Sequence, residues 1–192
     1  MRQTLLNYLT IGRNVMLAPR QFFQRMSITE GIRQVLFFVM LVYYIRCTLY
    51  FIMSYNRGYF FNPAIVVNKV TTPWAVIFLA LTPFLLLLIL YSQAIFVNRI
   101  GSFFGGMANF EGAFKILGFT LFISLFMLIP FVGAAAHIWA SIVLIIGVRY
   151  VFNVDWISSI LTLFFSYIFT AALYIIVFGI PALASKMVFL RL

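Results

Sequence analysis

The segment from Gly105 to Tyr150 constrains the fold more than any other part of the chain. It contains two apolar runs joined by a short break at Pro130 to Gly133; the first run follows the polar Asn109, and the second ends at Arg149. Each run is about 17 to 20 residues long, the length that a helix needs to cross a bilayer. Because lipid offers no hydrogen bonds to the backbone, the pattern predicts two membrane-spanning helices folded back as a hairpin.

The composition extends this conclusion to the rest of the chain. The 192 residues are 65% hydrophobic and 8% charged, whereas a soluble domain has about 25% charged residues. We therefore expect one all-α membrane domain over residues 1–192, a polytopic protein with five transmembrane helices and an N-terminal amphipathic interfacial segment. The spans are predicted at about residues 34–55, 74–97, 114–129, 134–152 and 157–180. Pro83 is expected to kink the second span, and the Gly-rich residues 98–112 are expected to form a connection.

The N-terminal residues 1–27 have the pattern of short helices with one polar and one apolar face. After Pro19, a favourable first helical residue, Phe22 and Phe23 face away from Arg20 and Arg25. Short helices of this kind lie in the membrane interface, so these four residues are predicted to contact the membrane. Packing of the segment on the protein's own spans explains the pattern equally well. Ser27 and Glu30 then have the spacing of a capping box that starts the first span.

The basic residues predict the orientation. With five spans and a cytoplasmic N-terminus, eight basic residues fall in inner segments and four in outer ones. The inner residues are Arg2, Arg13, Arg20, Arg25, Arg33, Arg99, Lys115 and Arg149, and the outer ones are Arg57, Lys69, Lys186 and Arg191. The positive-inside rule favours this arrangement. The same spread over connecting segments argues against a nucleic-acid partner, despite the net charge of +10.

Few residues are available for chemistry. The acidic residues and the histidine are Glu30, Glu111, Asp155 and His137. The chain has no phosphate loop, paired histidines, cysteine cluster or nucleophile elbow. We therefore predict a non-enzymatic protein with no metal and no cofactor. The carboxylates are expected to form weak surface pairs with neighbours such as Lys115, although they could also mark a docking face, and His137 is expected at the membrane interface.

Arg46 is the exception to the apolar spans. It lies about 18 Å along the first span in a hydrocarbon core about 30 Å thick, where a lipid-facing guanidinium would cost at least about 2.5 kcal/mol. It should therefore face the bundle, with Tyr43, Tyr50, Tyr91 and Gln93 as candidate partners. Satisfaction by these neutral groups or by water is one interpretation. The other is that Arg46 holds a lipid phosphate or another anion between the first two spans.

The order of several short motifs resembles the Yip domain family, membrane proteins named for their interaction with Ypt and Rab GTPases. The resemblance covers roughly residues 15 to 180. They are Ala18-Pro19, Phe22-Phe23, Gly31, Gly105-Gly106, Phe110, Gly118-Phe119, Ile129-Pro130, Gly133, Ile138-Trp139, Gly147 and Val148-Arg149. The resemblance implies five spans, and the compact form implies a prokaryotic-type member in the plasma (inner) membrane.

Two functions follow as hypotheses. The first is an integral membrane protein that organises partner proteins or lipids, with the bilayer, including anionic lipid, as one partner and an unidentified membrane or cytoplasmic protein as another. The alternative is a transporter or channel component, or a lipid-handling protein with an anion site around Arg46. A homo-oligomer is compatible with both.

Overall fold

The computed structural model describes residues 2–26, 31–55, 72–107, 109–129 and 131–175. All regular structure within these ranges is helical, and none of the described residues forms a strand. The elements are α1 (Arg2–Leu17), α2 (Pro19–Arg25), α3 (Arg33–Tyr55), α4 (Thr72–Phe103), α5 (Phe110–Thr120), the 3-10 helix η1 (Leu121–Leu128), α6 (Val132–Phe152) and α7 (Trp156–Tyr174). The predicted all-α class is confirmed.

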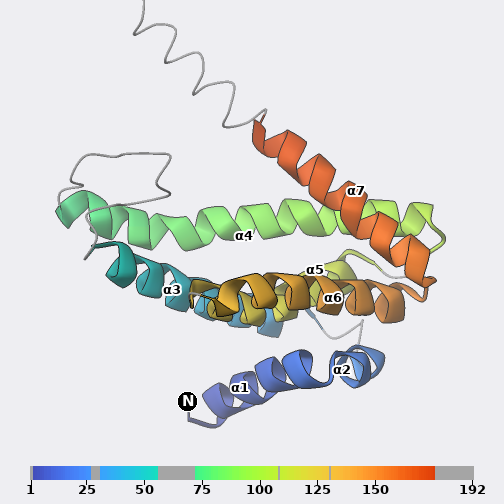
Figure 1. The fold of residues 1–192 in the computed structure, drawn as a ribbon, viewed down its shortest axis with the longest axis horizontal. Helices are drawn as coiled ribbons and strands as arrows, with labels where there is room; N and C mark the ends of the chain where they lie inside the picture. Colours follow the sequence, from blue (N-terminus) through green and yellow to red (C-terminus); the bar gives the residue numbers. More distant parts are fainter. Residues whose placement is uncertain (1, 27–30, 56–71, 108, 130, 176–192) are drawn as a thin grey trace, which may run out of the picture.

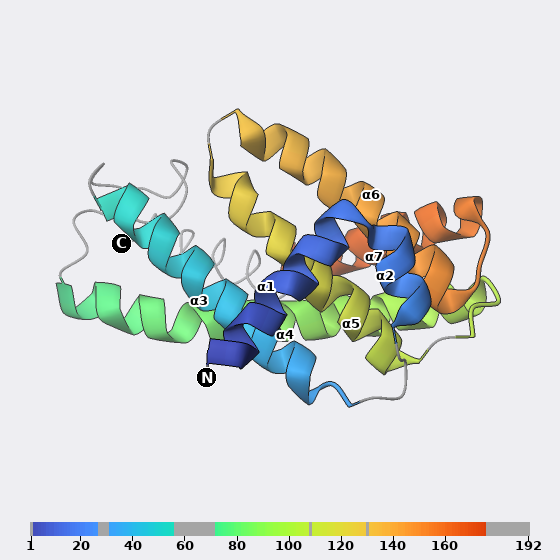
Figure 2. The ribbon, with the colours of Figure 1, turned by 90° about the horizontal axis from the view of Figure 1, so that it is seen from below.

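The helices form three layers (Figure 1). Helices α4 and α7 make one outer layer, α3, α5, η1 and α6 the middle layer, and α1 with α2 the opposite outer layer. Figure 2 shows α1 running obliquely across the middle layer, between α3 and α6. The core therefore lies around α5 and η1, which are covered on both sides.

Four helical segments in the described part of the chain are long and apolar enough to cross a membrane. They are Leu79–Phe103, Phe110–Leu128, Val132–Phe152 and Trp156–Leu173. The 23-residue helix α3, predicted as the first span, is not among them. The prediction of a helical membrane protein is thus confirmed, but a count of five spans is not.

The central hairpin forms as the sequence predicts. Asn109 caps α5 by accepting a hydrogen bond from the Gly112 amide at 3.0 Å, and η1 continues the same span. After the break, α6 packs back against η1. A Cβ on Gly133 would lie 2.7 Å from the Met127 carbonyl oxygen, so the tight return of the chain requires glycine there.

The N-terminal segment packs on the protein's own helices. Val15, Pro19 and Phe23 are buried, and the Trp139 indole donates a hydrogen bond to the Met16 carbonyl at 3.0 Å. The polar side of α1 is exposed, including Arg13. The amphipathic pattern therefore matches a helix that covers the bundle with its apolar side.

One local prediction is corrected. Residues 98–103, expected in a connection, extend α4, and Gly101 there meets the Phe152 ring so closely that a Cβ would lie 2.7 Å from it. Close packing, rather than turn chemistry, explains this glycine. Pro83 lies inside α4, and the kink there stays a prediction. The capping box at 27–30, the loop at 56–71 and the end of the predicted fifth span at 176–180 lie outside the described residues.

Candidate functional site: a cavity around Arg46

Arg46 lies on α3, 13 positions after its first residue Arg33, which places it about 20 Å along the helix at about 1.5 Å per residue. Its side chain is half-buried and lines a cavity of about 220 Å³. The prediction that Arg46 faces the bundle agrees with this position. One water needs only about 10–15 Å³ of such space, so the cavity can hold a larger group beside the guanidinium.

The cavity is built by six elements, α3, α4, α5, η1, α6 and α7. Its polar lining consists of Arg46, Gln93, Thr120, Ser124, His137 and Tyr167, and its apolar lining of Leu90, Leu117, Leu121, Met127, Ala140 and Leu144. Ala140 is a small residue of α6, and small residues let neighbouring helices approach closely. One arginine thus meets several neutral hydrogen-bonding groups.

The polar groups of the lining differ in whether they have a hydrogen-bond partner within the protein. The Thr120 hydroxyl donates to the Ile116 carbonyl at 2.8 Å, and the Tyr167 hydroxyl shares a side-chain hydrogen bond with Gln93. Ser124, in contrast, is only 5% exposed, and its hydroxyl has no hydrogen-bond partner. A buried hydroxyl without a partner costs about 1–3 kcal/mol. A polar occupant of the cavity that bonds to Ser124 would remove this cost.

None of the described carboxylates lines this cavity. Glu111 pairs with Lys115 at 2.8 Å, four residues further along α5. Asp155 caps α7 by accepting from the amides of Ile157 and Ser158 at 3.1 and 3.4 Å. The hydrogen bond with the Ser158 side chain, with smaller backbone contributions, lowers the pKa of Asp155 below its ordinary value. Both described carboxylates therefore act locally, outside the lining around Arg46.

Of the predicted partners of Arg46, the structure brings only Gln93 to the cavity. Tyr43 is buried and Tyr50 is exposed, but neither lines it. Tyr91 is 48% exposed, and its ring packs 4.7 Å from that of Phe110. The sequence analysis missed Thr120, Ser124, His137 and Tyr167. Thr120 and Ser124 stand four apart in an apolar run, which is a helical-face signal that could have indicated them.

The four residues predicted to contact the membrane differ in exposure. Arg20 and Arg25 are exposed on α2, and the Arg20 guanidinium lies 5.5 Å from the Tyr150 ring centre. Phe23 is 2% exposed, because it packs beside Gly147 of α6. Phe22 is half-buried against Phe119, with ring centres 5.3 Å apart. The membrane-contact prediction does not hold for Phe23, and the alternative, packing on the protein's own helices, describes it.

No metal-ligating cluster of three or more His, Cys, Asp or Glu residues exists within the described ranges. The arrangement can instead bind an anion, because a guanidinium and several hydroxyl and amide donors face one space. An apolar wall beside them suits an amphiphilic molecule.

The fold and this cavity define a multi-pass helical membrane protein with a polar centre. The Yip1 domain family matches residues 13–180, and the chain belongs to this family. No curated protein and no solved structure matches it.

Proposed function

We propose that the protein is a non-enzymatic integral membrane protein that organises membrane lipids by holding an anionic lipid headgroup in the cavity around Arg46. The observation that carries the proposal is the lining itself. Among the described residues it combines one guanidinium, the unpartnered Ser124 hydroxyl and other neutral polar groups, and no carboxylate that would neutralise the charge.

The chemistry favours a phosphate group over water alone. Arginine offers a planar fork of donors that fits phosphate oxygens, and charge-assisted hydrogen bonds are about twice as strong as neutral ones. The Ser124 hydroxyl can donate to a further oxygen. The apolar residues of the same cavity, such as Leu90 and Leu144, would contact the adjoining acyl region.

The topology is part of the same proposal. We infer that α3 is a fifth span, that the N-terminus is cytoplasmic and that the protein resides in the plasma membrane, as the basic residues and the family indicate. In a variant whose Cys47 is replaced by serine, a cysteine at the exposed Ser102 should react with a membrane-impermeant reagent only after the cytoplasmic side is opened. Labelling of this cysteine from outside the intact cell would show that the opposite orientation is correct.

The test of the proposed function is Arg46→Leu. The full-length protein should fold as before but lose the phospholipid that co-purifies with it from native membranes, as measured by lipid mass spectrometry. Arg13→Leu, which removes an exposed arginine on α1, is the matched control and should retain the lipid. If Arg46→Leu keeps the same lipid at the same stoichiometry, the proposal is wrong.

The same purification addresses the alternative functions. A small anion recovered in place of lipid would favour a transporter or channel component. A stoichiometric protein partner that persists in Arg46→Leu would place the organising role on another surface.

A further inference from the structure

A second cavity lies between the N-terminal segment and the bundle, away from Arg46. It has a volume of about 400 Å³. The lining residues are Ile11, Asn14, Ala18, Gln21, Phe22, Arg25, Met26, Gly31, Gln34, Val35, Lys115 and Phe119. They come from α1, α2, α3 and α5 and the residues beside them, so the cavity exists only because α1 and α2 pack on the middle layer.

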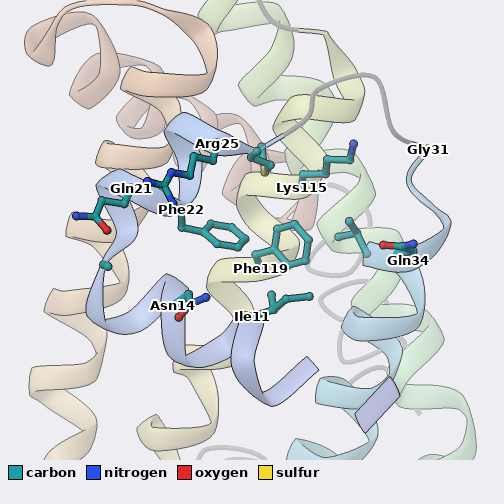
Figure 3. A pocket seen from close by; sticks show the side chains of 12 residues that line it. Ile11, Asn14, Gln21, Phe22, Arg25, Gly31, Gln34, Lys115 and Phe119 are labelled. Carbon is teal, nitrogen blue, oxygen red and sulfur yellow. The ribbon is translucent and has the colours of Figure 1, made fainter. Parts of the chain in front are cut away.

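The polar residues surround an aromatic floor (Figure 3). The rings of Phe22 and Phe119 lie in the middle, with Asn14, Gln21 and Arg25 on the side of α1 and α2, and with Lys115 and Gln34 on the opposite side. The two rings meet edge to face, which gives the floor a fixed shape. The rings thus separate Arg25, on the side of α2, from Lys115 on the other side.

The described lining of this cavity carries positive charge. Among the described residues it contains Arg25 and Lys115 and no carboxylate, while Glu30, next to Gly31, lies outside the described residues. Glu111 pairs with Lys115 from the same helix and offsets one of the two charges, which leaves the charge of Arg25. Lys115 is only 3% exposed, so its charge acts in a poorly solvated place where electrostatic interactions are strong.

We propose that this cavity is a second anion site, which binds a phosphate group at the junction of the N-terminal segment with the bundle. A phosphate has enough acceptor oxygens to use the Arg25 guanidinium and side-chain amides together, whereas a carboxylate has only two; Lys115, paired with Glu111, contributes through the positive potential of the lining. Its source is either a lipid headgroup or free phosphate, and both have the chemistry that the lining recognises. Occupancy links α2 to α3 and α5, so phosphate binding strengthens the docking of the N-terminal segment.

The proposal can be tested independently of the cavity around Arg46. In full-length protein carrying Arg46→Leu, inorganic phosphate is titrated by calorimetry, and the same protein is titrated with nanodiscs of phosphatidylglycerol or phosphatidylcholine. Arg25→Gln should weaken the binding about tenfold, the effect of losing one hydrogen bond to a charged group. Arg13→Gln removes the same charge from an exposed position on α1 outside the lining and should change the binding less than twofold.

The outcomes are distinct. If Arg25→Gln weakens only the binding of inorganic phosphate, the site takes free phosphate. If it weakens only the binding of phosphatidylglycerol discs, the site takes a lipid headgroup. Both results support the site. Equal effects of Arg25→Gln and Arg13→Gln, or no phosphate or lipid binding in the Arg46→Leu background, overturn it. These results leave the lipid recovery measured for Arg46→Leu against wild type unchanged, so the two sites stand or fall separately.

Discussion

Lys115 and Arg46 both place a positive charge within the helical bundle, but they are stabilised in different ways. Lys115 has a carboxylate partner on its own helix, Glu111, at 2.8 Å. Arg46 has neutral groups from several helices around it and no carboxylate in the cavity lining. The difference teaches that the first charge is satisfied by local sequence, whereas the second depends on tertiary structure and leaves room for an anion.

The largest expected effect comes from breaking the local pair. Glu111→Gln leaves the Lys115 ammonium buried without its counter-charge, and we expect the free energy of unfolding to fall by about 3 kcal/mol. The measurement is an unfolding titration in mixed micelles. The double variant Glu111→Gln with Lys115→Met should recover most of the loss, because it removes both charges. A loss below about 1 kcal/mol for the single variant would show that water solvates Lys115 in the native state.

A smaller effect of opposite sign is expected at Ser124. Ser124→Ala removes a buried hydroxyl that has no partner, so the lipid-free protein should gain about 1 kcal/mol in stability. The same variant should bind phospholipid more weakly, because one donor to the phosphate is lost. A loss of stability in lipid-free protein would contradict the assignment, since it would reveal a partner within the protein.

The fold could be predicted from the sequence where signals are local. The hairpin, the Asn109 cap and the approximate position of each helix follow from apolar runs and polar breaks. The extent of α4 could not be predicted, because residues 98–103 look like a Gly-rich connection until Phe152 packs on Gly101. The burial of Phe23 depends in the same way on a distant glycine, Gly147.

The site was predicted only in part for a similar reason. Arg46 stands out because a charge within an apolar run is rare. Its neighbours come from helices far apart in the chain, so the sequence indicates the tyrosines on the same helix but not Tyr167. The burial of Lys115 was also missed, because the pattern of Glu111 and Lys115 looks the same for a surface pair and for a buried one.

A pH effect should identify the contribution of the Asp155 cap. Because folding lowers the pKa of Asp155, the stabilisation of the α7 N-terminus is present above the unfolded-state pKa and is lost as the pH falls through the folded one. Hydrogen exchange at the Ile157 and Ser158 amides should therefore show lower protection at acidic pH. Asp155→Asn keeps a capping acceptor but cannot titrate, so its protection should not change over this pH range. An identical pH profile in both proteins would exclude the Asp155 cap as the cause.

The smallest effect is expected at Tyr91. Its ring packs on Phe110 outside the cavity. Tyr91→Phe should therefore leave the amount of recovered lipid unchanged and the free energy of unfolding within about 0.5 kcal/mol of wild type. Loss of lipid in this variant would mean that the cavity extends further along α4 than the structure indicates.

The most direct test of the central claim is a distance measurement between Arg46 and phosphorus. Solid-state NMR on the full-length protein in native lipid, with ¹⁵N-labelled arginine, can detect ³¹P near a guanidinium. Comparison with Arg46→Leu assigns the signal to Arg46. We predict phosphorus dephasing that shows a phosphate in hydrogen-bonding range of this side chain and that disappears in the variant. A dephasing curve unchanged by Arg46→Leu would contradict a phosphate site in the cavity.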